Sequence, residues 1–431
     1  MTQHTTGGTF SSSWGTIVST AGVAIGLGNI WRFPYMMGQH GGAWFLLAYL
    51  MIAIAFGLPA LMAEWALARH TRCGTLGAFE KAGLPWGRYA GYLLILTVLM
   101  AGSYYVVIVA WVLYFACHFA GNAIGLSGPG DFDVLVESWT LQGVFLIIVA
   151  VLGGGALCLG VRRGIEKVSR WGLPIFFALV LILMVRVLMI DGAWAGLREF
   201  LVPRWENFSR TTPLAALGQV FFSFGLGGTF MLVYGSYMRD DEDIPRVAIC
   251  TAGADIAAAL MAGMIVIPAA LAFHLPTSSG ATLMFEVMPA VFQQMSGGAW
   301  FGAMFFGSVF VVALLSQMAA YEVVVGALAG RMGWSRKWCV VITVTTSCVL
   351  AIPALRSIRY IESSDMIWGS TMQPVGALFA VVALVWCGIR GQALSEIRRE
   401  SRLPVPNWLF YWIKFGIPIG IVSTLVFYWL G

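Results

Sequence analysis

The stretch that decides the fold is Gly22-Val23-Ala24-Ile25-Gly26-Leu27-Gly28-Asn29-Ile30-Trp31-Arg32-Phe33-Pro34. Its apolar residues are typical of a membrane-spanning helix, yet glycines interrupt it and Asn, Arg and Pro follow. A helix that breaks at membrane depth leaves backbone N–H and C=O groups unpaired. Such groups are tolerated only where they line a site enclosed by protein. The segment therefore predicts a binding site within the membrane.

The composition is that of an integral membrane protein. Of 431 residues, 59% are hydrophobic and only 10% are charged. Segments apolar enough to cross a hydrocarbon core, which takes about 20 residues each, occur eleven times. We therefore expect an all-α membrane protein with eleven transmembrane helices. They lie near residues 14–37, 42–68, 89–120, 140–160, 166–189, 213–237, 246–273, 299–329, 337–354, 365–388 and 407–429.

The distribution of Lys and Arg predicts the orientation of the chain. Short loops on one side of the expected helices are rich in these residues, whereas the loop near 121–139 has three acidic residues and neither Lys nor Arg. Two other loops on that second side do contain arginines. Because basic loops stay in the cytoplasm, we expect a multi-pass protein of the cell (inner) membrane with its N-terminus cytoplasmic. The net charge of +5 then lies beside the lipid bilayer, and nucleic acid is not an expected partner.

A second interruption falls in the sixth expected helix, at Gly225-Leu226-Gly227-Gly228-Thr229. Two broken helices in corresponding positions indicate an inverted repeat of five plus five helices with the substrate site at the repeat interface. The repeats would cover about 14–189 and 213–388, followed by an extra helix at 407–429, in a single transporter domain over 1–431. Glycines that only permit close helix packing are the alternative.

Motifs along nearly the whole chain point to one family of transporters. They are Gly28-Asn29-Ile30-Trp31-Arg32-Phe33-Pro34-Tyr35, Gly41-Gly42, Pro59, Glu64, Tyr104-Tyr105, Gly164, Pro174, Gly218-Gln219-Val220-Phe221-Phe222-Ser223 and Ile267-Pro268-Ala269. Together they resemble the neurotransmitter:sodium symporter family, bacterial amino-acid transporter branch. The resemblance implies a leucine-transporter-like fold and sodium-coupled symport of amino acids by alternating access.

The broken first helix suits a zwitterionic substrate. Its unwound carbonyls can hold an ammonium group, and the N–H groups of the half-helix that begins near Leu27 and Gly28 can hold a carboxylate. Tyr105 resembles the family tyrosine that donates its hydroxyl to that carboxylate. A Tyr that only packs, or that lies at the membrane interface, is the alternative.

The resemblance also places a set of residues around the substrate. They are Val23, Ala24, Leu27, Gly28, Ala101, Tyr105, Phe222, Ser223, Gly225, Gly228, Gln317 and Ala320. Several are Ala or Gly where the branched-aliphatic transporter has bulky residues, which favours an aromatic or otherwise bulky hydrophobic amino acid. The alternative is that neighbouring side chains such as Phe224 or Met231 refill the space.

The family's first sodium site maps onto Ala24, Asn29, Ser223 and Asp255. Asp255 lies within an expected membrane helix, where an unpaired carboxylate costs roughly 3 kcal/mol or more. A bound cation would account for it, although a carboxylate facing a cytoplasmic water path is the alternative. Chloride-dependent relatives have Asn at this position, so Asp255 predicts independence of chloride.

The family's second sodium site maps onto Gly22, Ile25, Val312 and Ser316. The adjacent position supplies a side-chain oxygen in most members but is Leu315 here. Losing one oxygen from a site with few ligands should weaken the site. We therefore expect one sodium ion per substrate.

The expected gates differ between the two ends of the molecule. Arg32 and Asp365 match the extracellular pair, with Gln219 placed to help, although Arg32 could instead be a snorkelling anchor. The cytoplasmic pair is missing, because its positions fall near Gly7 and Gly330.

Three other charged residues of the expected helices lie outside these gates. Glu64 should accept hydrogen bonds from the unwound sixth helix. Glu322 and Arg186 have no partner that the sequence identifies, and the best interpretation of Glu322 is a member of a buried polar network.

Other functions stay open from the sequence. The missing cytoplasmic pair and Leu315 also fit an amino-acid receptor or regulator that does not transport, and a symporter of another small amine or amino-acid derivative fits the same motifs. An enzyme is not expected, because the chain has no HExxH motif or other metal-ligand pair and no evident Ser/His/Asp set.

Overall fold

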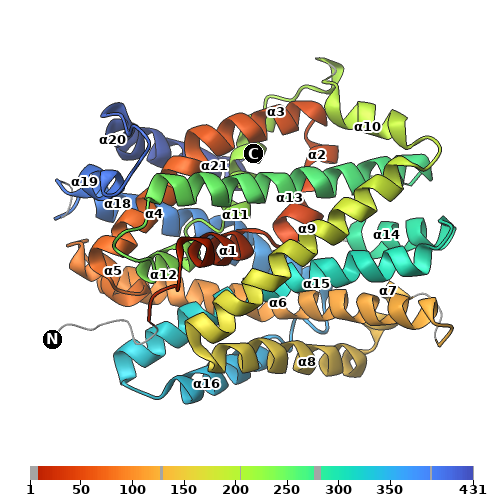
Figure 1. Cartoon of the computed structure of the whole chain (residues 1–431), viewed down its shortest axis with the longest axis horizontal. Coiled ribbons are helices and arrows are strands. Elements are labelled where there is room, and N and C mark those ends of the chain that lie inside the picture. The colour runs from red at the N-terminus through yellow and green to blue at the C-terminus, as the bar shows by residue number, and fades with distance from the viewer. Residues whose placement is uncertain (1–7, 127–129, 204, 276–282, 389–390, 431) are drawn as a thin grey trace.

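The computed structural model describes residues 8–126, 130–203, 205–275, 283–388 and 391–430, and within these ranges the regular secondary structure is entirely helical (Figure 1). Eight of the described helical segments are long and apolar enough to cross a membrane. They are Ala43–Thr71, Gly87–Ala123, Trp139–Cys158, Val161–Leu188, Ile244–Ala272, Gly298–Met332, Ile358–Val385 and Trp408–Phe427. Each overlaps one segment expected from the sequence, and the protein is a multi-pass membrane protein.

These segments are built from the following elements. They are α3 (Ala43–Ile52), η2 (Ala53–Gly57) and α4 (Leu58–Thr71); α6 (Gly87–Ala123); α8 (Trp139–Cys158); η3 (Val161–Glu166) and α9 (Lys167–Leu188); α13 (Ile244–Ala272); α15 (Gly298–Met332); α17 (Ile358–Ser364), η6 (Asp365–Thr371) and α18 (Met372–Val385); and α20 (Trp408–Tyr411), η7 (Trp412–Gly416) and α21 (Ile417–Leu430). Shorter helices connect them: α5 (Thr75–Lys81), α7 (Phe132–Glu137), α10 (Ala193–Leu201), η4 (Trp205–Asn207), α14 (Leu283–Gln294) and α19 (Ala393–Arg398).

The first and sixth expected helices are each broken, as the sequence predicts. The first consists of α1 (Ser13–Ala24), η1 (Gly28–Arg32) and α2 (Phe33–Gln39), and the sixth consists of α11 (Thr212–Ser223) and α12 (Phe230–Ser236). The ninth is the short helix α16 (Arg336–Leu350). The count of eleven transmembrane helices and the inverted repeat stay predictions.

The break in the sixth helix depends on glycine. The backbone of Gly227 has φ of +75° and lies so close to α18 that a Cβ atom there would be 1.7 Å from the carbonyl oxygen of Gln373. Gly225 also has positive φ, at +61°. Only glycine adopts these conformations readily, and only glycine allows this close approach. The sequence therefore forces the chain out of the helix at this point.

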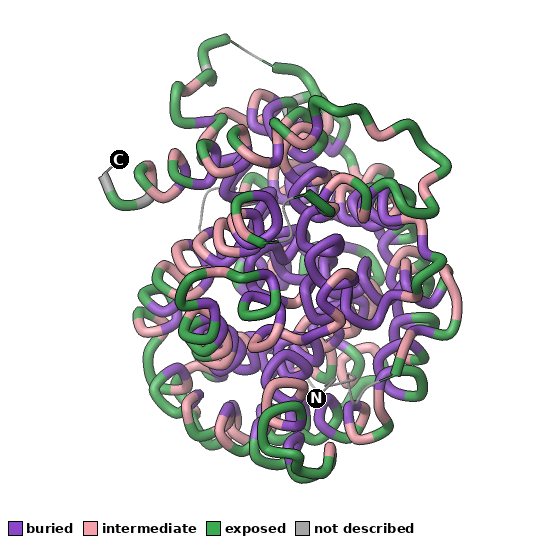
Figure 2. The backbone as a smooth tube through the Cα atoms, turned by 90° about the vertical axis from the view of Figure 1, so that its left-hand side faces the viewer, coloured by how far each residue is buried: buried purple, intermediate pink, exposed green. Residues whose placement is uncertain are grey.

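The broken helices lie inside a shell of long helices. Figure 1 shows α1 near the middle of the molecule, and α6 and α15 pack along each other through the centre. Buried residues gather in the interior of the tube in Figure 2, and exposed residues lie around it. The breaks therefore lie where protein, and not lipid, surrounds the backbone.

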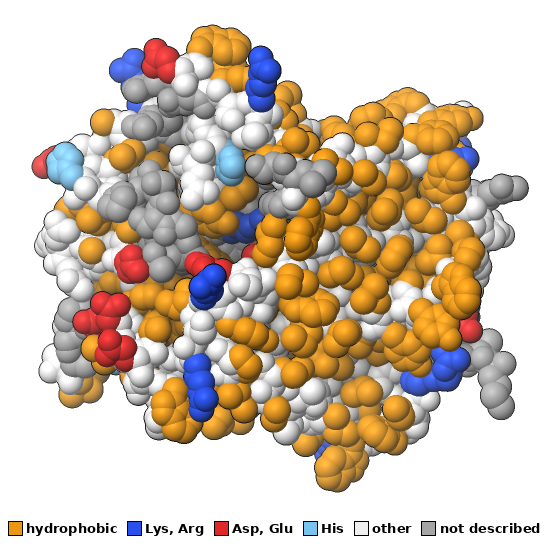
Figure 3. Space-filling model, turned by 180° about the vertical axis from the view of Figure 1, so that it is seen from behind, with side chains coloured by type: hydrophobic (Ala, Val, Ile, Leu, Met, Phe, Trp, Pro, Cys, Tyr) orange, Lys and Arg blue, Asp and Glu red, His pale blue; other side chains and the backbone are white. Residues whose placement is uncertain are grey.

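The outer surface is apolar where a membrane would contact it. Hydrophobic side chains cover almost all of the right-hand part of the face in Figure 3, while charged side chains gather on its left and at its right-hand margin. Ile54, Val151 and Trp171, on three different long segments, are 64%, 65% and 67% exposed. A soluble protein rarely exposes an apolar surface of this extent, so this surface fits contact with lipid.

Candidate functional site

A cavity lies beside the break in the first helix. It encloses about 620 Å³ of space free of atoms, a figure that includes space open to solvent. Its lining consists of Val23, Ala24, Gly26, Leu27, Gly28, Ala101, Gly102, Tyr104, Tyr105, Phe222, Ser223, Gly225, Phe230, Ser316, Ala320 and Gln373. Every residue that the sequence places around the substrate is in this lining except Gly228 and Gln317. We call this space the central cavity.

The two exceptions have local causes. A Cβ atom on Gly228 would be 2.2 Å from the ring of Phe230, so this ring occupies the space that the glycine leaves. Phe230 can reach it because Thr229 has φ of +58° and turns the chain. Gln317 is fully buried, and its amide donates to the carbonyl oxygen of Gly102 at 3.2 Å. The space is thus partly refilled, as the alternative supposed: by Phe230 at Gly228, and by Phe230 and Met231 next to Gly225, where the end of the Met231 side chain would be 3.8 Å from a Cβ atom.

The unwound backbone of the first helix has polar groups near the cavity that bond to side chains and not to the backbone of a helix. The N–H of Leu27 points to the hydroxyl of Tyr105 at 3.5 Å, and the N–H of Gly26 donates to the side-chain oxygen of Asn29 at 3.0 Å. On the other side of the break, the amide of Gln219 donates to the carbonyl oxygen of Gly28 at 2.8 Å. The break therefore presents donors and acceptors together, as a zwitterionic ligand requires.

A buried polar cluster surrounds Asp255 on α13. Its carboxylate accepts hydrogen bonds from Asn29 at 2.8 Å, from Ser223 at 2.8 and 3.0 Å, and from the hydroxyl of Tyr49 at 3.0 Å. Each of these four residues is at most 2% exposed. Among the described residues, the ion pairs do not include Asp255. A buried carboxylate with only neutral partners leaves a negative charge for a cation to balance.

We call these four residues the Asp255 cluster. The sequence predicted Asn29, Ser223 and Asp255 together, and Ala24 lies beside them in the lining of the central cavity. It missed Tyr49. The only signal was a Tyr in the second apolar segment, which by itself is typical of packing.

A second polar locus lies where α1 meets α15. The hydroxyl oxygen of Ser316 is 3.3, 3.2 and 3.3 Å from the carbonyl oxygens of Val23, Ile25 and Val312. We call these four residues the Ser316 locus. Its polar atoms are neutral, and the hydroxyl itself lies against the carbonyls.

The side chain of Leu315 closes this locus on one side. A Cβ atom on Gly22 would be 3.1 Å from a methyl carbon of Leu315 and 3.3 Å from the hydroxyl oxygen of Ser169. Gly22 is therefore next to a methyl group at the position where most family members supply an oxygen. Of the four residues expected at the second sodium site, Ile25, Val312 and Ser316 come together, with Val23 as a further carbonyl, whereas Gly22 lies against Leu315.

The residues expected at the outer gate separate two cavities. Tyr104 and Phe222 line both the central cavity and an outer one, and Arg32 and Asp365 line the outer one. The guanidinium of Arg32 lies 4.4 Å from the centre of the Phe222 ring and donates to Ser370 at 3.4 Å. Asp365 accepts a hydrogen bond from Tyr104 at 2.8 Å. The four side chains thus form a layer between the substrate space and the outer opening.

The expected contact of Glu64 with the sixth helix is confirmed. Its carboxylate accepts a hydrogen bond from the N–H of Gly227 at 2.7 Å. This N–H lies in the unwound segment, where no helical carbonyl can accept it. Glu64 therefore stabilises the break that shapes the central cavity.

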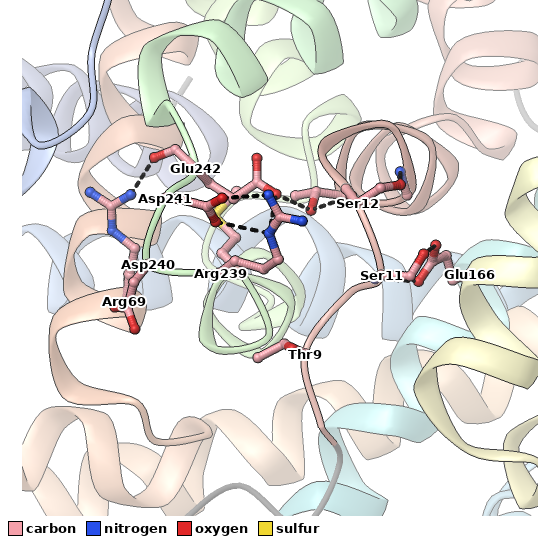
Figure 4. A network of polar contacts seen from close by, with 12 residues as sticks. Thr9, Ser11, Ser12, Arg69, Glu166, Arg239, Asp240, Asp241 and Glu242 are labelled. Carbon is pink, nitrogen blue, oxygen red and sulfur yellow. Dashed lines mark hydrogen bonds and ion pairs between the residues drawn. The ribbon is translucent and has the colours of Figure 1, made fainter.

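A different network replaces the missing pair at the end that holds the N-terminal segment. The N–H of Phe10 donates to the carbonyl oxygen of Tyr237 at 3.0 Å, and the N–H of Ser11 donates to Glu166 at 2.9 Å. Figure 4 shows Ser11 beside Glu166, with Arg239 held by Asp241 nearby. Of the two positions expected to have lost their charges, Gly7 lies outside the described residues.

Glu322 and Arg186 do have partners, and Glu322 belongs to a buried polar network, as expected. Glu322 is fully buried, forms an ion pair with Arg336 at 2.5 Å and accepts a hydrogen bond from Tyr237 at 2.7 Å. Arg186 lies 5.4 Å from the centre of the Phe301 ring. Arg336 was missed because it lies at the start of α16, after the turn that follows the end of α15, and spacing alone does not show where this turn places its side chain.

Comparisons with known proteins agree with this geometry. The model of the Sodium:neurotransmitter symporter family matches residues 7–124 and 132–430. The uncharacterized sodium-dependent transporter YhdH of Bacillus subtilis is 28% identical, over 97% of this chain and 96% of its own. The sodium-dependent serotonin transporter of Drosophila melanogaster is 25% identical, over 80% of this chain and 64% of its own.

A solved structure is also similar. The crystal structure of MhsT in complex with L-phenylalanine superposes with a TM-score of 0.88 at 30% sequence identity, covering 97% of this chain and 99% of that one. The relatives are transporters and not enzymes, and they are sodium-dependent. The chain belongs to the sodium:neurotransmitter symporter family.

Proposed function

We propose that this sodium-coupled symporter carries amino acids with bulky hydrophobic or aromatic side chains across the cell (inner) membrane by alternating access. The N-terminus is cytoplasmic in this proposal, in keeping with the basic loops on that side. The observation that carries it is the juxtaposition of the broken first helix, the central cavity and the buried Asp255 cluster.

The charged ends of the substrate bind at the break in the first helix. The carboxylate accepts hydrogen bonds from the hydroxyl of Tyr105 and from the N–H groups near Leu27 and Gly28. The ammonium donates to the carbonyl oxygens of the unwound segment. Tyr105 supports this pose because its hydroxyl already lies 3.5 Å from the N–H of Leu27 and lines the cavity. The pose requires both charges, so it excludes esters and N-acylated amino acids.

One sodium ion binds at the Asp255 cluster, with Ala24, Asn29, Ser223 and Asp255 as its ligands. The cluster offers the hard oxygen atoms and the net negative charge that an alkali cation needs. The Ser316 locus binds sodium weakly. With one Na⁺ and a zwitterion, one positive charge crosses per cycle, and each 100 mV of membrane potential contributes about 2.3 kcal/mol to accumulation.

Small residues in the cavity wall support a bulky substrate side chain. Ala101, Gly225 and Ala320 contribute little volume to this wall, although Phe230 takes up some of the space. The solved relative MhsT was crystallised with L-phenylalanine, which fits the same size class. The layer of Arg32, Tyr104, Phe222 and Asp365 acts as the outer gate, and Gln219 anchors it to the first helix.

Uptake into proteoliposomes tests the proposal. Radiolabelled L-phenylalanine should accumulate when a sodium gradient is directed inward and should not accumulate when potassium replaces sodium on both sides. The methyl ester should compete poorly, and equal competition by the ester would rule out the pose. Sodium-dependent binding without any accumulation would instead indicate a receptor or regulator.

A further inference from the structure

One polar side chain in the central cavity has no role in the proposal above. Gln373 lies in the first turn of α18, lines the cavity, and is 7% exposed. Among the residues that the structure describes, its side-chain amide makes no hydrogen bond to any partner. This amide is not one of the buried side-chain groups that lack a partner, so it faces accessible space, and a ligand that covers it without a hydrogen bond would remove the hydrogen bonds that it has with water.

The other glutamines near the core behave differently. Gln219 donates to the carbonyl oxygen of Gly28 at 2.8 Å, and Gln317 donates to that of Gly102 at 3.2 Å. Gln142 accepts from the indole of Trp111 at 2.8 Å and donates to two carbonyl oxygens. Each of these amides forms at least one hydrogen bond within the protein, although the amide oxygens of Gln219 and Gln317 are buried without a partner. Gln373 differs because its side chain forms no such bond and the residue lines the cavity.

The backbone of Gln373 is fixed against the break in the sixth helix, through the close approach of its carbonyl oxygen to Gly227. The neighbouring part of the wall is apolar. A Cβ atom on Gly225 would be 3.5 Å from the ring of Phe230 and 3.9 Å from Val23. Gln373 is thus a polar group beside otherwise apolar surface, on a different helix from the groups that hold the substrate's charged ends.

We propose that Gln373 selects substrates whose side chain has an apolar body and one uncharged hydrogen-bonding atom. This inference rests on the proposed function, in which the carboxylate and ammonium are bound at the first helix and the side chain extends toward the sixth. A primary amide both donates and accepts, so it pairs with a hydroxyl, an indole N–H or an amide. A purely apolar substrate side chain leaves the Gln373 amide buried and unpaired.

Pairs of amino acids of similar size, in which one member has a polar group that the other lacks, test this selection. They are L-tyrosine against L-phenylalanine, L-threonine against L-valine, and L-asparagine against L-leucine. The measurement is thermal stabilisation of the purified protein in sodium, titrated with each amino acid. For the pair that best fits the cavity, the wild type should bind the polar member about tenfold more tightly, the usual effect of one such hydrogen bond.

Three variants separate the contribution of the amide from other effects. Gln373→Met keeps the length of the side chain and should reduce the tenfold preference to about one or reverse it, whereas Gln373→Asn keeps an amide and should retain part of it. Thr371→Val is the matched control, because its hydroxyl bonds to the carbonyl oxygen of Met366 and to Trp429, outside the cavity lining.

The outcomes distinguish the two proposals. An unchanged preference in Gln373→Met, with sodium-dependent binding retained, would overturn the selection by Gln373 and leave the transport proposal standing. If Gln373→Met does not fold, the other two proteins still test the selection by Gln373. A preference for the apolar member of each pair, in both the wild type and Gln373→Asn, would overturn it equally. Failure of every amino acid to stabilise the wild type would overturn the proposed function and this inference together.

Discussion

The Asp255 cluster and the Ser316 locus both adjoin the break in the first helix, but they differ in what their side chains supply. The cluster has a buried carboxylate within 3.0 Å of three neutral hydrogen-bonding side chains. The locus has one hydroxyl among three backbone carbonyls, with a methyl group of Leu315 against Gly22. The locus thus depends mainly on backbone carbonyls, whereas the cluster has a charge and more side-chain oxygens.

This difference shows how one broken helix can serve two sites of unequal strength. Unwound carbonyls offer partial negative charge wherever a helix breaks. A cation also has to leave water, and a full charge among its ligands compensates for that cost far better than dipoles alone. The sodium ion should therefore bind at the cluster, and substitutions at the two places should have very different effects.

Removing the charge of Asp255 should have the largest effect. We expect Asp255→Asn to lower the apparent sodium affinity by about 100-fold or more, because losing one charged ligand costs roughly 3 kcal/mol. The residue keeps its shape, so the hydrogen bonds with Ser223 and Tyr49 can in part persist. Sodium-dependent thermal stabilisation of the purified protein measures this affinity.

Asp133→Asn is the control for that measurement. Asp133 is an exposed carboxylate in α7, so its replacement should leave sodium affinity unchanged. If Asp255→Asn bound sodium as well as the wild type does, the contrast between the two loci would be wrong, and the carboxylate would have to serve another purpose.

Restoring an oxygen at the second locus should have an intermediate effect. We expect Leu315→Thr to steepen the sodium dependence of uptake from a Hill coefficient of about 1 toward about 2, because Ser316 and the carbonyls already lie in place. The measurement is initial uptake as a function of sodium concentration. Leu315→Val, which adds no oxygen, controls for the reduced volume.

Reversal potentials measure the number of sodium ions transported with each substrate, and this number decides the prediction. One sodium ion per substrate in the wild type and two in Leu315→Thr would sharpen the comparison. Two ions in the wild type would break it, and would mean that water or a neighbour such as Ser169 replaces the ligand that Leu315 lacks.

Removing the hydroxyl at the second locus should have a small effect in the wild type. We expect Ser316→Ala to change sodium affinity by less than about twofold, because a neutral hydroxyl in a weak site contributes little. In the Leu315→Thr background, the same substitution should return the steep sodium dependence to that of the wild type. A large loss in the single variant, with substrate affinity unchanged, would show that the locus binds sodium already.

The sequence could predict most of this comparison because its signals are local. Breaks in membrane helices follow from glycine clusters, and an Asp within an apolar segment is visible at one position. The grouping of the sodium ligands and the unusual Leu315 came instead from the resemblance to the family. Contacts between residues far apart in the chain have no comparable local signal in the sequence. Tyr49 reaches Asp255 across 206 residues, and Arg336 returns from the next helix to pair with Glu322.

The cavity shows the same limit. Gly228 predicts open space, but the positive φ of Thr229 brings Phe230 into it, and a backbone angle cannot be read from composition. Gln373 likewise lines the cavity only because Gly227 allows α18 to approach. Both residues depend on how two segments pack, which one sequence does not determine.

Replacing chloride should have the smallest effect, namely none. Relatives described as sodium- and chloride-dependent include a GABA transporter of Drosophila melanogaster that is 24% identical to this chain. In the proposal made here, the Asp255 carboxylate already supplies a fixed negative charge beside the sodium ion, so a mobile anion is not needed to balance it.

Substituting gluconate for chloride on both sides of proteoliposomes should therefore leave the initial rate of sodium-driven uptake within experimental error. The Asp255→Asn variant sharpens the test, because it removes the fixed charge. If any sodium-driven uptake remains in that variant, chloride should increase it. A wild type that stops transporting in gluconate would show that the charge of Asp255 is not sufficient, and the distinction between the two loci would then have to rest on ligand number alone.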